Sequence, residues 1–475
     1  MKRVLMAVAA WVVWAPVVGW AADETKMATE VVELIRQKQL DAAADKLDQA
    51  LRAFPDSPSL NVQRSVLAKR LDEAGRPADA ARQIEALLDY ALRVAANQPR
   101  MRPILFKYLF QLRALGQKAK QPDAVERKID ALIQMAASLP NHGILQGLLR
   151  AQKAMVLAEH GKSKEALALA DQLVAQAKAE HEAAPEDVSA LVRLINMQKT
   201  RIDVLNSFRL DQARTAQQEL LELLAEQAPK HKSEPDVVKA YVFESVAQAA
   251  RLSRDHPEQA DTVIAKLKQY IEGLNRNDPG IRSDLARAER GLKAVQSRIN
   301  TARQQRALIG TPAVFPENVV AWIGGDALAS DDLKGKVVVL DFWAVWSGPC
   351  IQAFSHLRRW HEQYAGQGLV IIGATRYFHF DWDDQQHRIR FVSDLSPEKE
   401  KEALKRFAQH HQLPYRLAVF TDTSLMKHYA VKAIPQTVVI DRRGIVRMIR
   451  TGSGQQAMQE LEAMIQQCLS ESLAN

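Results

Sequence analysis

The four residues Ser347-Gly348-Pro349-Cys350 place a hydroxyl and a thiol three positions apart, directly after Trp346. Two cysteines at this spacing carry out thiol–disulfide exchange, in which the first attacks as a thiolate and the second resolves the mixed disulfide. A serine hydroxyl cannot form a disulfide, so this chain holds one half of that chemistry. The residues therefore predict either a single working thiol at Cys350 or a site that does not turn over.

Four roles for Cys350 are compatible with the sequence. The thiol is an inert remnant of a dithiol site, or a monothiol that forms mixed disulfides when it is exposed. It pairs with Cys468, the other cysteine of the chain, or it is a peroxidatic or sensing thiol. The stretch from Ala344 to Cys350 lacks the Pro-x-x-x-Thr-x-x-Cys pattern of peroxiredoxins, which argues against the last role.

A strand and a helix must hold this turn in place. Residues 337–343 form a continuous apolar run, as expected for a strand that is covered on both faces. A helix is predicted to start near Ser347 and to run to about Tyr364. Ser347 is expected either to cap the N-terminus of this helix or to form a hydrogen bond with Cys350. The remaining predicted elements are strands over 369–375, 417–420, 436–440 and 445–450, and helices over 396–411 and 455–469. This alternation predicts an α/β domain after a Pro- and Gly-containing linker at 308–316.

Several motifs of this α/β segment occur in an order and at a spacing that can be compared with those of a known protein family. They are Leu333-Lys334-Gly335-Lys336-Val337-Val338, Asp341-Phe342-Trp343-Ala344, Trp346-x-Gly348-Pro349-Cys350, Ile434-Pro435, and the glycines Gly452 and Gly454. Together they resemble the thioredoxin fold, and most closely the exported TlpA/ResA-like thioredoxins of the redoxin group. The resemblance covers about residues 308–470, one third of the chain.

The resemblance implies a role for each matching residue. Asp341 corresponds to the buried carboxylate of thioredoxins. Burial would raise the pKa of this carboxyl, so that it could shuttle a proton for Cys350. Trp343 is expected in the core. Pro435 is expected to be cis, to lie against the turn and to present backbone to a substrate chain. The residues expected to bind substrate are Trp346, Gly348, Pro349, Ile434 and Pro435.

The implied activity is that of a thiol–disulfide oxidoreductase. It would act through Cys350 on polypeptide thiols or disulfides, with Asp341 assisting and Ser347 in the place of the nucleophilic cysteine. The alternative is a redox-inactive binding module on a helical scaffold that recruits a protein partner. Whether the chain is an enzyme stays open on the sequence, and no cofactor is expected.

An insertion after the second strand carries aromatic and acidic residues at 379–384, near the expected mouth of the site. No zinc or calcium ligand set with suitable spacing is complete there, so no metal site is predicted. A solvated loop is one expectation. An aromatic contact surface formed by Tyr377, Phe378 and Trp382 is the other.

Residues 22–305 are rich in strong helix formers, with apolar residues at three- and four-residue spacing. Proline and glycine breaks predict some dozen helices of about 12 to 20 residues. The run 157–167, with Gly161 at its turn and Ala166 after it, resembles the turn of a tetratricopeptide repeat, and residues 75–80 echo it. The prediction is a tetratricopeptide-like solenoid or an antiparallel bundle that recruits partners or spaces the C-terminal domain.

The N-terminus has the pattern of a secretory signal: Lys2 and Arg3, an apolar run over 4–18, and Gly19-Trp20-Ala21 as a cleavage site. We expect export to the periplasm, with an uncleaved anchor in the inner membrane, facing the periplasm, as the alternative. The predicted parts are therefore a signal peptide at 1–21, an all-α region at 22–305 and a thioredoxin-fold α/β domain at 306–475.

Charge and cysteine content exclude two classes of protein. The net charge of +8 is spread over the helices and forms no basic cluster in the sequence, so no nucleic-acid partner is expected. Two cysteines in 475 residues exclude a disulfide-stapled scaffold, and the fold must depend on its apolar cores. The oligomeric state has no signal in the sequence.

Overall fold

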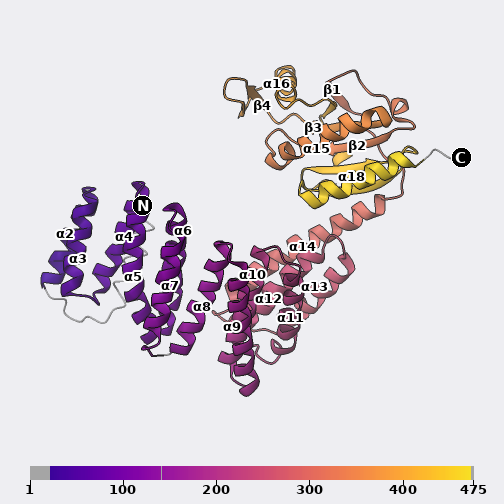
Figure 1. The fold of residues 1–475 in the computed structure, drawn as a ribbon. Helices are drawn as coiled ribbons and strands as arrows, with labels where there is room; N and C mark the ends of the chain where they lie inside the picture. The colour runs from indigo at the N-terminus through magenta and orange to yellow at the C-terminus, as the bar shows by residue number, and fades with distance from the viewer. Residues whose placement is uncertain (1–21, 141, 472–475) are drawn as a thin grey trace. The chain divides into compact units, whose positions relative to one another are not determined.

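The computed structural model describes residues 22–140 and 142–471, so the predicted signal peptide at 1–21 lies outside the described residues. The chain divides into two compact units that meet between Tyr241 and Val242. The first unit is helical, and the second holds helices followed by a six-stranded sheet (Figure 1). The predicted change from helices to an α/β domain at 306 falls inside the second unit.

Proline starts many of the helices in the first unit. Pro58, Pro77 and Pro122 each occupy the first turn of a helix, where the missing N–H would have no intrahelical partner. At these three prolines, the predicted break between two helices is the point at which the next helix begins. The helices are α2 (Ala22–Arg36), α3 (Leu40–Ala53), α4 (Pro58–Glu73), α5 (Pro77–Asn97), α6 (Arg102–Lys118), α7 (Pro122–Ala136), α8 (His142–Glu159), α9 (Ser163–Ala183), α10 (Val188–Ser207), α11 (Gln212–Gln227) and α12 (Pro235–Leu252), which crosses the boundary.

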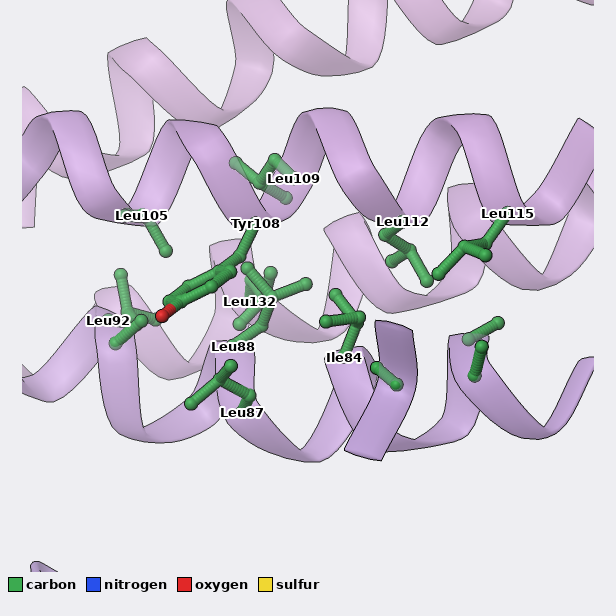
Figure 2. Packing of buried hydrophobic residues seen from close by; sticks show 14 of the residues in the cluster. Ile84, Leu87, Leu88, Leu92, Leu105, Tyr108, Leu109, Leu112, Leu115 and Leu132 are labelled. Carbon is green, nitrogen blue, oxygen red and sulfur yellow. The ribbon is translucent and has the colours of Figure 1, made fainter. Parts of the chain in front are cut away.

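Apolar stripes of neighbouring helices form the core of the first unit. Figure 2 shows Leu112 of α6 pointing toward Ile84 of α5, and both side chains are almost fully buried. Burying such a side chain stabilises the fold by roughly 1.5–3 kcal/mol. At Gly116 an added Cβ would lie 2.4 Å from a methyl carbon of Val125, so the glycine permits the close approach of α7. The i, i+3 and i+4 spacing seen in the sequence therefore gives this packing.

Glycine turns join helices where the sequence echoed a helical repeat. Gly161, between α8 and α9, has φ +74°, and Gly75, between α4 and α5, has φ +76°. These left-handed conformations cost glycine little. Ala166 of α9 is fully buried, as a small residue at a close helix contact should be. The two-helix turns are confirmed, and the assignment to tetratricopeptide repeats stays a prediction.

The second unit contains a mixed six-stranded sheet in the order β1-β6-β3-β2-β7-β8. Strands β2, β3 and β6 are parallel, whereas β1 pairs antiparallel with β6 and β7 pairs antiparallel with both β2 and β8. The elements are α13 (Pro257–Glu272), α14 (Arg282–Leu308), β1 (Val319–Ile323), β2 (Val337–Phe342), α15 (Gly348–Tyr364), β3 (Leu369–Arg376), β4 (Phe380–Asp383), β5 (Arg388–Phe391), α16 (Pro397–His410), β6 (Arg416–Phe420), α17 (Ser424–His428), β7 (Gln436–Ile440), β8 (Val446–Thr451) and α18 (Gln455–Ser470). This is the thioredoxin arrangement, and the predicted fold class is confirmed.

Alternation along β2 sorts the side chains between two cores. Val337 and Val339 pack in the same core as Cys350, while Val338 and Leu340 pack on the opposite face with residues of α17. Because successive strand residues point to opposite faces, Asp341 lies on the same face as Val339. The strand therefore directs the buried carboxylate toward the face that carries the active-site turn.

Four of the elements named for this unit were not predicted, namely the strands β1, β4 and β5 and the short helix α17. The edge strand β1 precedes the predicted sheet, and β4 and β5 form a two-stranded hairpin in the insertion. The expectation of a solvated loop there is wrong, because alternating residues of the hairpin pack onto α16. Trp382 of β4 is only 4% exposed and meets the ring of Phe407 edge-on at 5.3 Å.

Candidate active-site turn and the adjoining pocket

Ser347 caps the helix that carries the thiol. Its hydroxyl oxygen accepts a hydrogen bond from the backbone N–H of Cys350 at 3.3 Å, and Gly348 and Pro349 form the first turn of α15. A serine N-cap satisfies one of the helix's unpaired N–H groups. The predicted N-cap role of Ser347 is confirmed.

The hydroxyl of Ser347 and the thiol of Cys350 also hydrogen-bond to each other. Ser347 is 4% exposed and Cys350 is fully buried. Burial raises the pKa of the Cys350 thiol to about 11, although the hydrogen bond from Ser347 acts in the opposite direction. The thiolate is the nucleophile in disulfide exchange. In this geometry the sulfur is therefore both protonated at neutral pH and out of reach of a substrate.

Cys468 does not complete the site. Both cysteines are free, so the disulfide between Cys350 and Cys468 that the sequence left open is not formed. Cys468 is fully buried in α18, and burial raises the pKa of its thiol to about 11. The second thiol is thus as inaccessible as the first.

Asp341 is a buried acid on the strand that leads into the turn. It is 1% exposed, and Oδ1 accepts a hydrogen bond from the hydroxyl of Thr437 at 2.9 Å. Burial raises the pKa of the carboxyl from an ordinary 3.8 to about 7, and the bond from Thr437 lowers it in part. Negative charge on Asp341 in turn raises the pKa of Cys350. A group that titrates near neutral pH is suited to accept or donate a proton.

The loop before β7 contains the expected proline. The Ile434–Pro435 peptide bond is cis, and Pro435 is buried. The carbonyl of Pro435 accepts a hydrogen bond from the N–H of Gly452 at 2.8 Å, so it is already used. Among the described residues the backbone of Ile434 has no hydrogen-bond partner. The residue with backbone to offer a bound chain is therefore Ile434 rather than Pro435.

A pocket of about 410 Å³ opens beside the turn, bounded by Trp346 and Ile434. Trp346 is 51% exposed, and its ring meets that of Phe378 edge-on at 5.9 Å. The lining residues are Phe342, Trp343, Trp346, Ala374, Thr375, Arg376, Phe378, Phe420, Asp422, Leu425, Met426, Val431, Lys432, Ala433 and Ile434. The strands β2, β3 and β6 end here, so the pocket lies at the carboxyl edge of the parallel part of the sheet. This is a common place for a binding site in such sheets.

One wall of the pocket is held by a residue that the sequence did not single out. Glu400, in the first turn of α16, is 2% exposed. Its carboxylate accepts hydrogen bonds from the backbone N–H groups of Phe378, His379 and Phe380 at 2.6, 3.0 and 3.2 Å. Glu400 thereby fixes the segment that carries Phe378 against Trp346. In sequence it looks like any acidic residue near a helix start.

The predicted aromatic surface is partly right. Phe378 lines the pocket, and Tyr377 is half-buried next to it. Trp382 is a core residue of the hairpin and not a contact surface, as its contact with Phe407 shows. Trp343 is 2% exposed and stacks on Phe407, which confirms its place in the core.

Metal-binding clusters and membrane-spanning helices are both absent from the described ranges. Within residues 22–140 and 142–471, no group of three or more His, Cys, Asp or Glu side chains could hold a metal ion. In the part of the chain that the structure describes, none of the helices combines the length and apolar character that a membrane span needs.

Comparison with known proteins finds similarity in the C-terminal third of the chain. The family model described as the AhpC/TSA family matches residues 316–449. The thiol-disulfide oxidoreductase ResA of Bacillus cereus is 26% identical over 35% of this chain and 81% of its own length. The thioredoxin-like protein YneN of Bacillus subtilis is 24% identical over 29% of this chain and 69% of its own.

A solved structure, a thiol-disulfide isomerase from Corynebacterium glutamicum, is 22% identical with a TM-score of 0.27, over 34% of this chain and 99% of that one. The family match and the sheet order together establish a thioredoxin-like domain in the C-terminal third. Its sequence relatives include thiol–disulfide oxidoreductases.

Proposed function

We propose that this chain is an exported thioredoxin-fold protein that binds polypeptides at its Trp346–Cys350 turn without catalysing thiol–disulfide exchange. The observation that carries the proposal is the closed pair of Ser347 and Cys350: one sulfur, fully buried, hydrogen-bonded to a hydroxyl. The contact surface beside it is intact, because Trp346 is exposed and the backbone of Ile434 is unpaired among the described residues. Recognition is thus retained where the reaction is not.

The other parts of the proposal come from the sequence. The signal-like residues 1–21 favour export to the periplasm, with an inner-membrane anchor as the alternative if the segment is retained. The region at 22–305 would act as a tetratricopeptide-like scaffold that recruits a protein partner, and residues 306–475 would form the binding domain. Helical repeats of this kind stack into extended concave surfaces suited to such a role.

A second candidate function is a monothiol oxidoreductase, and Asp341 favours it. With a pKa of about 7, this carboxylate is placed to take the proton of Cys350 once the turn opens. The thiolate would then attack a substrate disulfide, form a mixed disulfide and release the other substrate sulfur as a thiolate. Because position 347 has no sulfur, an external thiol would have to resolve the intermediate.

A paired assay on the purified full-length chain separates the two candidates. Reduction of a disulfide-containing protein substrate is followed with dithiothreitol as the electron donor, and binding of a reduced, alkylated polypeptide is followed by fluorescence anisotropy. The binding proposal predicts a measurable affinity with no reduction above the dithiothreitol background. Reduction that is lost in Cys350→Ser would support the monothiol instead.

A further inference from the structure

The pocket beside Trp346 has an apolar interior, and neither Ser347 nor Cys350 is among the residues that line it. Its inner surface includes Phe342, Phe420, Leu425 and Met426, which come from three different elements. A volume of about 410 Å³ is that of a ligand pocket rather than of a packing defect. An open apolar surface of this kind gains free energy when a bulky apolar group enters and displaces water.

The pocket lining carries more positive than negative side chains. Arg376 and Lys432 line it, and in the described ranges neither forms an ion pair. The only acidic residue in the lining is Asp422, whose carboxylate accepts hydrogen bonds from the backbone N–H and hydroxyl of Ser424 and from the amide of Asn318. These bonds hold the pKa of Asp422 below its ordinary value, so it is ionised and already satisfied. The two cations are therefore the charges left for a ligand.

We propose that the pocket takes a bulky apolar side chain of a polypeptide that carries an acidic residue two positions away from it. The inference deepens the proposed function and rests on it. Within residues 22–140 and 142–471 the backbone N–H and carbonyl of Ile434, at the rim, have no partner, which suits an extended chain that pairs with this residue as an added strand. In such a chain every second side chain points the same way, so when one apolar side chain enters the pocket, an acidic residue two positions away lies on the same side and can meet Arg376 or Lys432.

Three labelled hexapeptides test this with the full-length chain, by fluorescence anisotropy at low ionic strength. The first is Gly-Glu-Phe-Leu-Glu-Gly, the second replaces both Glu by Lys, and the third replaces Phe-Leu by Ser-Ser. We expect the first to bind at least about tenfold more tightly than either of the others. Its affinity should fall as salt is raised, because exposed charge pairs are screened.

Two neutralising variants assign the charge preference to the pocket. Lys432→Gln and Arg376→Gln should each weaken the acidic apolar peptide about two- to fivefold, as expected for exposed charge pairs, without weakening the lysine peptide. Lys399→Gln is the matched control, because Lys399 is exposed on α16 and lies outside the pocket lining. It should change neither affinity.

The outcomes distinguish this inference from the proposed function. Equal binding of the Glu and Lys peptides would overturn the charge preference and leave polypeptide binding standing. Equal binding of the Phe-Leu and Ser-Ser peptides would show that the pocket is not entered, and would overturn the inference too. If none of the three peptides nor the reduced, alkylated polypeptide binds, the proposed function itself fails.

Discussion

The turn at Ser347–Cys350 and the pocket next to it share a rim at Trp346, but they differ in solvent exposure and in whether their polar groups are already paired. In the turn, the polar groups bond to each other and are buried. In the pocket, apolar side chains line an open cavity whose two cations form no ion pair within the described ranges, while Arg376 lies over the ring of Phe378. Most of the pocket lining comes from β3, β6, α17 and the loop before β7, and neither Ser347 nor Cys350 belongs to it. The serine at position 347 therefore changes the turn without changing the residues that line the pocket. We propose that recognition and reactivity are separable in this fold.

The largest effect is expected from restoring the missing sulfur. Ser347→Cys places a thiol at the N-terminus of α15, where the helix dipole stabilises a thiolate. Disulfide reduction in the protein-substrate assay should rise from background by at least about a hundredfold, because a low-pKa thiolate then has Cys350 as its resolving partner. Peptide affinity should stay the same. If both thiols react with a thiol reagent and no reduction appears, the turn lacks more than a sulfur.

The buried acid of the turn should make stability depend on pH. Its pKa is raised in the folded state, so between pH 4 and pH 7 the folded chain binds a proton that the unfolded chain has lost. The contribution of Asp341 is therefore favourable at low pH and is lost as pH rises toward and past 7. Relative to Asp341→Asn, the native free energy of unfolding should fall by on the order of 4 kcal/mol between pH 4 and pH 8.

Denaturant unfolding at both pH values measures that difference. Other groups titrate in the same range, so only the difference between the native chain and Asp341→Asn is informative. The asparagine carbonyl can still accept the bond from Thr437, which keeps the variant comparable. Parallel curves for the two proteins would mean that Asp341 keeps an ordinary pKa.

A smaller effect is expected on the pocket side. Glu400→Gln replaces one carboxylate oxygen by an NH₂ group, which cannot accept a hydrogen bond from the backbone of Phe378, His379 or Phe380. A buried N–H left unpaired costs about 1–3 kcal/mol, and thermal unfolding should shift accordingly. Peptide affinity should weaken because Phe378 loses its support.

Glu402→Gln is the control for this prediction. Glu402 lies two residues further along α16, is exposed and pairs with Lys405. It should change neither stability nor affinity. Should Glu400→Gln destabilise the chain yet leave peptide binding intact, the wall that carries Phe378 has no part in recognition.

Much of the turn could be predicted from the sequence because local patterns determine it. The apolar run of β2, the Ser347 cap and the cis Pro435 each depend on neighbouring residues or a family motif. Two of the missed elements, β4 and β5, also had local signals: Phe380-Asp381-Trp382-Asp383 and Arg388-Ile389-Arg390-Phe391 alternate with the period of a strand. The hairpin could therefore have been found.

The pocket and its support could not be predicted in this way. Glu400 bonds to backbone groups about 20 residues earlier in the chain, and Phe420 and Ile434 meet Trp346 only through the sheet order. No spacing in the sequence records such contacts. Burial of Cys350 is similar: the family pattern suggested it, but the bond to Ser347 and the packing around it required the three-dimensional structure.

The rate at which a thiol reagent modifies Cys350 in the folded chain tests the central claim most directly. At pH 8 a thiol with a pKa of about 11 has roughly 200-fold less thiolate than an ordinary cysteine, before burial is counted. The Cys350→Ser variant measures the reaction of Cys468 alone, which is subtracted from that of the native chain. We expect Cys350 to be modified at least roughly 200-fold more slowly in the folded chain than in the unfolded chain. A rate in the folded chain equal to that of an exposed cysteine would contradict the closed turn and favour the monothiol.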